Sequence, residues 1–226
     1  MSEIRILAFA GSARTESFNK KVVSVAAAGA EKAGGTVTYI DLRDYPMPLY
    51  DGDLETESGL PENALKMKQL IHEHHGLLIS TPEYNSAIPP LLKNVIDWCS
   101  RPAESNPELS GLAPFAEKTG ALLGASPGPG GGIRALPGVR QLLQNIGITM
   151  VPRVLAVGSV GALFVSGPRV QVYQARTMTV NSTRECTERR QQFAAHIHDI
   201  LRVPMVTAVR IGWIPDDNAG ENTASH

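Results

Sequence analysis

The stretch Ala10-Gly11-Ser12-Ala13-Arg14-Thr15-Glu16-Ser17-Phe18-Asn19 decides how this chain folds and what it binds. A compact apolar run at residues 4–10 precedes it and is typical of a buried strand. Residues 20–32 follow, with apolar side chains at helical spacing. The first N–H groups of a helix lack partners and attract anions, and this turn adds hydroxyls, an amide and the Arg14 guanidinium. The sequence therefore predicts a phosphate cradle between a strand and a helix.

The turn lacks the residues of two common phosphate-binding loops. A dinucleotide fingerprint needs glycines at positions 11, 13 and 16, and of these only Gly11 is present. A Walker A loop needs Gly-Lys-Ser/Thr at positions 16–18, where this chain has Glu16-Ser17-Phe18. The hydroxyl-rich turn instead suits a single terminal phosphomonoester, as in FMN. The alternative is an ordinary strand-to-helix turn in which a serine or asparagine caps the helix.

Composition limits the classes of protein to consider. The chain has 226 residues, of which 42% are hydrophobic, and this fits one globular domain with a substantial core. A formal net charge of −1 gives no general attraction to nucleic acid or to an anionic membrane. Cys99 and Cys186 match neither a disulfide framework nor a metal-binding spacing. The sequence shows no signal peptide and no apolar run of membrane-spanning length, so we expect a cytoplasmic protein.

Strands and helices alternate along the chain. Further strands are predicted at 36–40, 77–81, 118–124 and 148–157, and helices at 61–74, 91–99, 139–146 and 183–202. Pro137-Gly138 predicts a helix break, and Pro152 predicts a bend or a sheet edge. The proline-rich segment 45–51 is predicted to be a rigid apolar loop that packs on the protein. The alternation implies right-handed crossovers and a parallel sheet.

Three unusual loops follow the first, third and fourth predicted strands. They comprise residues 12–19, 82–88 and 126–132. The carboxyl ends of parallel strands share one edge of the sheet, and ligands bind there at the switch in strand order. Convergence of three such loops at one edge predicts a single binding site more strongly than any loop alone.

The chain resembles the NADPH-dependent FMN reductase family, which includes quinone, chromate and azo-dye reductases. The resembling motifs are Gly11-Ser12-x-Arg14-x-x-Ser17-x-Asn19, Pro82-Glu83-Tyr84-Asn85 with Pro89 and Leu92-Lys93-Asn94-x-Ile96-Asp97-Trp98, and Ser126-Pro127-Gly128 with Gly131-Gly132. The resemblance implies an α/β, flavodoxin-like open parallel five-stranded sheet of order 2-1-3-4-5 with helices on both faces. It places one FMN-binding domain at 1–202 and a C-terminal extension with a polar tail at 203–226. It also implies FMN as cofactor, NADPH or NADH as co-substrate, and a homodimer or homotetramer.

The resemblance assigns cofactor contacts residue by residue. Around the FMN phosphate and ribityl chain it places Ser12, Arg14, Ser17, Phe18 and Asn19. Along the isoalloxazine ring it places Pro82, Glu83, Tyr84 and Asn85, and on the other side Ser126 and Gly128. Ala87 departs from the serine that is common in the family, so a hydroxyl contact is lost there, and Ser86 is the candidate replacement. The break at Pro137-Gly138 is a second departure, beside the third loop.

The implied activity is transfer of hydride from NAD(P)H to the bound flavin, then of two electrons to a small acceptor such as a quinone, flavin, chromate or azo compound. The flavin carries the chemistry, so no side chain is predicted to be catalytic. Two alternatives stay open: a flavodoxin-type electron carrier, and an interaction protein that has lost FMN. Neither nucleic acid nor a membrane is an expected partner.

Other polar and aromatic residues receive structural interpretations. Glu83 is expected to order its loop instead of acting as a base, and Asp41 to be a strand-end carboxylate. Cys99 is expected in the core, and Trp98 at a dimer interface. The histidines at 72, 74 and 75 are spaced poorly for a metal, so no metal site is predicted.

Overall fold

The computed structural model describes residues 3–104, 106–160 and 172–176. Its sheet has six strands in the order β2-β1-β3-β4-β5-β6, and the first five are parallel. They are β1 (Arg5–Ala10), β2 (Thr36–Ile40), β3 (Gly76–Thr81), β4 (Thr119–Ala125), β5 (Thr149–Val157) and β6 (Val172–Arg176). The predicted order 2-1-3-4-5 is confirmed. The sequence did not predict β6, which pairs antiparallel with β5.

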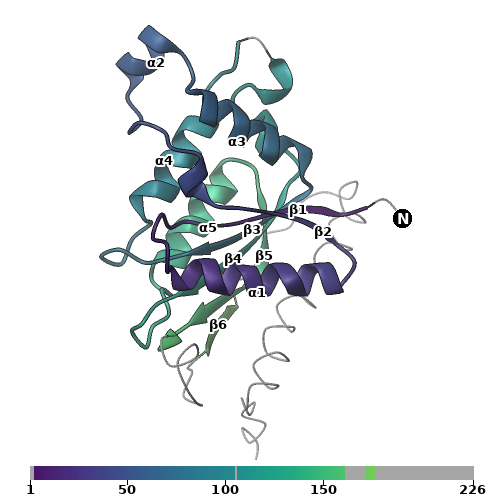
Figure 1. The fold of residues 1–226 in the computed structure, drawn as a ribbon, viewed down its shortest axis with the longest axis vertical. Helices are drawn as coiled ribbons and strands as arrows, with labels where there is room; N and C mark the ends of the chain where they lie inside the picture. The colour runs from purple at the N-terminus through teal and green to yellow at the C-terminus, as the bar shows by residue number, and fades with distance from the viewer. Residues whose placement is uncertain (1–2, 105, 161–171, 177–226) are drawn as a thin grey trace, which may run out of the picture.

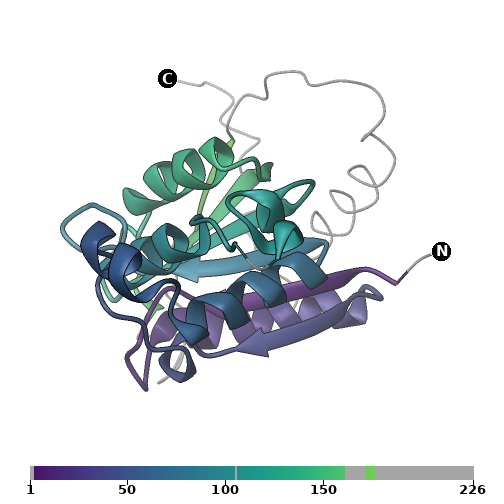
Figure 2. The ribbon, with the colours of Figure 1, turned by 90° about the horizontal axis from the view of Figure 1, so that it is seen from above.

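Helices cover both faces of the sheet, as predicted (Figure 1). They are α1 (Phe18–Lys32), α2 (Gly52–Ser58), α3 (Glu62–Glu73), α4 (Pro90–Cys99) and α5 (Ala135–Asn145), with short 3-10 helices η1 (Leu42–Asp44), η2 (Pro107–Leu109) and η3 (Ala113–Phe115). In Figure 2, α3, α4 and α5 lie in front of the sheet, and α1 lies behind it.

The strand side chains divide the core into two layers. Leu7 and Phe9 of β1 pack in one cluster with residues of α3, α4 and α5. Ile6 and Ala8, which alternate with them, pack on the opposite face with α1. Successive side chains of a strand point to opposite faces, so a strand that is apolar throughout requires cover on both sides. This pattern explains why the central strands are short apolar runs.

The helix break predicted at Pro137-Gly138 is wrong. Helix α5 begins at Ala135, so Pro137 lies in the first turn, where backbone N–H groups have no partner within the helix. A Cβ at Gly138 would lie 3.6 Å from Ile88, which shows that α5 packs against the loop after β3. The wall beside the third loop is therefore a continuous helix.

The loop at 45–51 packs on α4, as predicted. The carbonyl of Pro48 accepts hydrogen bonds from Asn94 Nδ2 and Trp98 Nε1, both at 2.8 Å, and the N–H of Tyr50 donates to Asn94 Oδ1 at 2.7 Å. Trp98 is fully buried within a single chain, and its ring meets that of Tyr50 edge-on at 5.0 Å. The prediction that Trp98 lies at a dimer interface is therefore wrong.

Strand β5 bends near Pro152, as predicted. Met150 pairs with Gly120, but the next pair joins Val154 to Leu122, so β5 carries extra residues in a bulge. The antiparallel pairing with β6 begins only at Arg153. A proline that donates no ladder hydrogen bond fits this place.

Some predictions concern residues that the structure does not describe. The helix at 183–202 and the extension at 203–226 lie outside the described residues, as does the predicted domain boundary at 202. Within the described segments, no helix is both long enough and apolar enough to cross a lipid bilayer.

Candidate cofactor site at the strand ends

The three predicted loops meet at one edge of the sheet. Ala10 pairs with Ser80 and Thr81 with Gly124, so β1, β3 and β4 end at the same level. The N–H of Gly11 donates to the Ser80 carbonyl at 2.8 Å, which ties the first loop to β3. The strand order reverses between β1 and β3, and this is where open α/β sheets bind ligands.

The start of helix α1 fits a phosphate group. Ser12 and Ser17 are each only 4% exposed. Ser17 is the N-cap residue, yet its hydroxyl makes no capping hydrogen bond, and the first turn holds no acidic side chain. A buried hydroxyl without a partner costs free energy, and the helix start attracts negative charge. Exposed Arg14 lies in the same loop, where its N–H donates to Ser12 Oγ at 3.3 Å.

Asn19 faces the sheet and joins three elements. Its Nδ2 donates to the carbonyl of Ala125 at 2.9 Å, while its Oδ1 accepts from the N–H of Ala125 at 2.9 Å and from Ser80 Oγ at 2.8 Å. The amide oxygen is thus occupied within the protein, and one amide hydrogen is left for any ligand. Asn19 holds α1 against the ends of β3 and β4. Its predicted cofactor contact stays a prediction.

Residues after β2 hold the outer side of the first loop. Lys20 Nζ binds Asp41 Oδ2 at 2.5 Å, and Asp41 Oδ1 accepts from the N–H of Arg43 at 3.0 Å. Arg43 Nη1 donates to Thr15 Oγ1 at 2.7 Å. Asp41 is therefore a strand-end carboxylate, as predicted. The sequence did not identify Arg43, because its partner lies 28 residues away along the chain.

The second loop contains a tight hairpin. Tyr84 and Ala87 exchange two backbone hydrogen bonds of 3.2 and 3.0 Å, and Asn85 and Ser86 have φ angles of 51° and 64°. Two positive φ angles are the signature of a type I′ turn. The backbone N–H and C=O of Tyr84 are both hydrogen-bonded within the turn. Tyr84 is 50% exposed, so its side chain is the part of the residue that is available to a ligand. Backbone contacts from this loop to a ligand can therefore come from Glu83, Asn85 and Ser86.

Glu83 joins the second loop to the start of α5. Its Oε2 accepts from the N–H of Arg134 at 2.9 Å, and its Oε1 accepts from Arg134 Nε at 2.6 Å. The Glu83 side chain is 8% exposed, whereas that of Arg134 is 71% exposed. The guanidinium, aided by the N–H groups of Arg134 and Ala135, holds the pKa of Glu83 below its usual value despite its burial. The carboxylate orders its loop, as predicted.

The third loop docks on the end of β5. Ser126 Oγ and the N–H of Ser159 both donate to the carbonyl of Gly128, at 3.0 and 2.9 Å. Gly131 has a φ of +61°, and a Cβ there would lie 2.6 Å from the nitrogen of Val157. A Cβ at Gly128 would instead have only Ser126 Oγ within 4 Å, at 3.8 Å. The surface at Gly128 is therefore open to a flat ligand.

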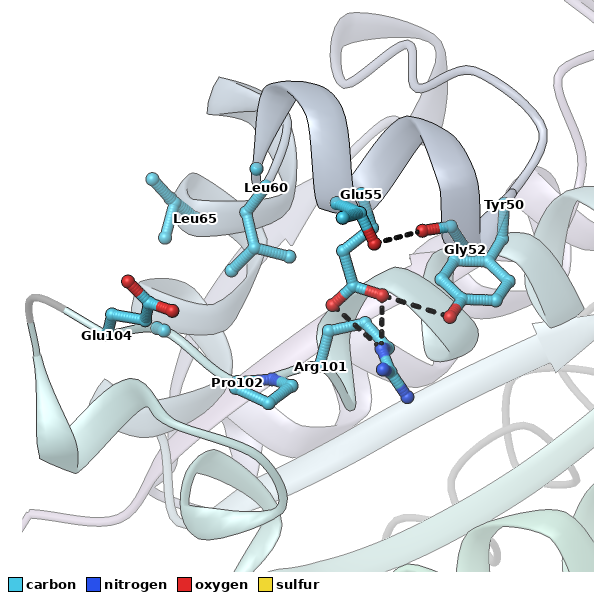
Figure 3. Close-up of a pocket in the computed structure, with 11 residues that line it drawn as sticks. Tyr50, Gly52, Glu55, Leu60, Leu65, Arg101, Pro102 and Glu104 are labelled. Atoms are coloured by element: carbon cyan, nitrogen blue, oxygen red, sulfur yellow. Dashed lines mark hydrogen bonds and ion pairs between the residues drawn. The ribbon is translucent and has the colours of Figure 1, made fainter.

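A separate pocket of about 730 Å³ lies between α2 and residues 101–104 (Figure 3). Arg101 Nε donates to both carboxylate oxygens of Glu55, at 2.9 and 2.8 Å, and the hydroxyl of Tyr50 donates to Oε2 at 3.0 Å. No residue of α2 is buried, so these contacts anchor it. None of the residues that line the pocket belongs to the three loops.

Other reactive side chains have structural partners. Burial raises the pKa of the Cys99 thiol to about 12, and its side chain lies in the core, as predicted. The ring of His74 bonds to the carbonyl of Leu70 at 2.6 Å and to Thr38 Oγ1 at 2.7 Å, and His75 Nδ1 accepts from the N–H of Arg5 at 3.0 Å. In the described part of the chain, no cluster of three metal-ligating side chains occurs.

Residues 4–162 match the family described as NADPH-dependent FMN reductase. The chain is 34% identical to a 2-hydroxy-1,4-benzoquinone reductase from a Burkholderia species, over 66% of this chain and 74% of that relative. It is 36% identical to an NAD(P)H-dependent FMN reductase of Pseudomonas aeruginosa, over 62% of this chain and 70% of that relative.

Solved structures agree with this assignment. The flavoenzyme FerB of Paracoccus denitrificans, an NAD(P)H:(acceptor) oxidoreductase, superposes with a TM-score of 0.54 at 31% identity, over 65% of this chain and 74% of FerB. With the strand order and the three loops in place, the protein is a member of the NADPH-dependent FMN reductase family, an oxidoreductase that uses FMN as cofactor and NAD(P)H as co-substrate.

Proposed function

We propose that the protein reduces a quinone at the expense of NAD(P)H, with FMN held by the loops at 12–19, 82–88 and 126–132. The observation that carries the proposal is the buried hydroxyl of Ser17, which makes no capping hydrogen bond at the start of α1, on the same sheet edge as the open surface at Gly128. The quinone as acceptor is supported by the benzoquinone reductase among the relatives.

Each loop has a separate task in this proposal. Ser12, Arg14 and Ser17 bind the phosphate through hydroxyls, a guanidinium and the N–H groups of the helix start. The hairpin at 84–87 presents Tyr84 at the ring edge, and Gly128 leaves space for the backbone to approach the ring. FMN, when bound, accepts a hydride and donates two electrons. The proton that a hydroquinone needs beyond the hydride would come from water, so no side chain has to supply it, and the protein positions the reactants.

The acceptor is tested by steady-state kinetics with purified, FMN-loaded protein. NADPH and NADH are each paired with a benzoquinone, chromate, an azo dye and free FMN. We expect the highest kcat/KM with the quinone. A higher kcat/KM with any other acceptor contradicts the proposed quinone specificity, although not the use of FMN.

We further propose that the protein is a homodimer or homotetramer, as the family resemblance implies. Leu49 supports an interface, because it is 79% exposed on a loop that is fixed to α4. Light scattering after size-exclusion chromatography measures the mass in solution, and a mass of one chain contradicts the proposal. The cytoplasmic location stays a prediction.

A further inference from the structure

The Glu83–Arg134 pair links two of the three loops at the predicted flavin site. Glu83 belongs to the loop after β3, and Arg134 stands at the start of α5, after the loop that follows β4. Strands β3 and β4 are adjacent and end at the same level. The pair therefore bridges the loop expected along the isoalloxazine ring to the loop expected on its other side.

The two residues contribute differently to this bridge: the Glu83 carboxylate caps a helix, and the Arg134 guanidinium supplies a positive charge. The Glu83 carboxylate bonds to the N–H of Arg134 at 2.9 Å, so it caps α5, which has no cap from its own N-cap side chain. The guanidinium of Arg134 is 71% exposed and adds charge-assisted bonds to the same carboxylate, including one at 2.6 Å. Loss of the Arg134 side chain leaves the cap in place, because the backbone N–H makes it, and removes the positive charge together with its bonds to Glu83.

We propose that Arg134 neutralises the charge of Glu83 at the flavin site, and that the pair thereby sets the redox potential of the bound FMN. This inference rests on the proposed function. Reduction adds electron density to the flavin ring, and charge near the ring tunes its potential. A buried carboxylate on the adjoining loop would disfavour reduction if it stood alone. The guanidinium compensates this charge.

The proposal predicts potential shifts of opposite sign. R134Q leaves Glu83 uncompensated, so the two-electron midpoint potential of bound FMN falls below that of the wild type. E83Q leaves the guanidinium uncompensated, so the potential rises. R134K keeps the charge, and the double variant E83Q/R134Q is neutral; both are expected near the wild-type potential. E62Q, which breaks the exposed Glu62–Lys66 pair on α3, is the matched control and leaves the potential unchanged.

The experiment is an anaerobic titration of each holoprotein against a redox indicator, with the Kd for FMN measured in parallel. Opposite shifts in the single variants, with recovery in R134K and the double variant, are the expected result. We expect R134Q to weaken FMN binding by no more than about fivefold, because the removed partner is exposed. If E83Q cannot be purified, comparison of the midpoint potentials of R134Q and R134K tests the inference by itself, since both variants keep the backbone N–H that bonds to Glu83.

Shifts in the same direction, or a double variant further from the wild type than either single one, would mean that the pair acts only through loop structure and overturn the inference. FMN binding and turnover by the wild type would then still stand. A wild-type protein that binds no FMN overturns the proposed function, and this inference falls with it.

Discussion

At the scale of single residues, the proposed phosphate cradle depends on Ser17, whose side chain makes no capping hydrogen bond to α1. Ser17 is placed at the N-cap of α1 by its extended backbone, with φ −69° and ψ 126°, and the residue is only 4% exposed. The motif around it could be read from the sequence because its residues are neighbours in the chain. The partners of Glu83 and Thr15 could not, since they lie 51 and 28 residues away.

Replacement of Ser17 by alanine tests this role. A hydrogen bond to a charged group contributes roughly 1.5–3 kcal/mol, so S17A should weaken FMN binding by about tenfold or more. Riboflavin, which lacks the phosphate, should bind S17A and wild type alike. Flavin fluorescence titrations of the apoprotein measure both affinities. S24A is the control, because Ser24 is exposed on the same helix. Equal loss of FMN and riboflavin affinity would show that Ser17 does not contact phosphate.

Lys68 shows how one buried ammonium secures a loop. It is fully buried on α3, and its Nζ donates to the carbonyls of Cys99 and Arg101 at 2.7 Å and to that of Gly111 at 3.3 Å. The end of α4 and the segment that follows are thus tied to α3. Burial lowers the pKa of Lys68 to about 8 from an ordinary value of 10.5.

K68M is expected to lower the free energy of unfolding at pH 7 by about 1–3 kcal/mol, because three carbonyls lose their donor. Between pH 8 and 10.5 the unfolded chain binds a proton at Lys68 that the folded chain does not. The stability of the wild type should therefore rise with pH across this range relative to K68M. Urea denaturation at several pH values measures the difference. Parallel pH profiles for the two proteins would contradict the lowered pKa.

At the scale of elements, regular periodicity predicted the five parallel strands and three of the helices closely. Helix α2 was missed because no residue of it is buried, so it has no apolar face to detect. The break at Pro137-Gly138 was wrongly predicted because the helix start was unknown, and a proline in the first turn is compatible with a helix. Strand β6 lies beyond residue 162, where the match to the family ends.

Substitutions at two glycines of the third loop are expected to affect different properties: stability at Gly131 and FMN binding at Gly128. G131A places a Cβ 2.6 Å from the nitrogen of Val157 at a positive φ, so it should cost about 2 kcal/mol or more of folding free energy. G128A has open space in the protein and should change stability by no more than about 0.5 kcal/mol. It should nonetheless weaken FMN binding, because a methyl group would enter the space for the ring. Thermal unfolding of the apoproteins and FMN titration provide the two readouts. A stable G131A, or a G128A that binds FMN like the wild type, would contradict this arrangement.

At the scale of the whole molecule, the parallel sheet brings three distant segments to one edge, where cross-links from Asn19 and Glu83 hold them together. The convergence was predictable, because parallel strands that share a sheet must end on the same side. The cross-links were not predictable, because they depend on the depth at which each loop packs. The resulting edge is the site that we propose for the flavin mononucleotide.

The most direct test is a two-stage anaerobic reaction of the FMN-loaded protein, followed through flavin absorbance. The account predicts that one equivalent of NADPH or NADH bleaches the bound flavin, and that one equivalent of a benzoquinone then restores its yellow colour. Bound flavin that neither nucleotide bleaches would identify an electron carrier. A protein that takes up no FMN would contradict the assignment of the three loops as its site.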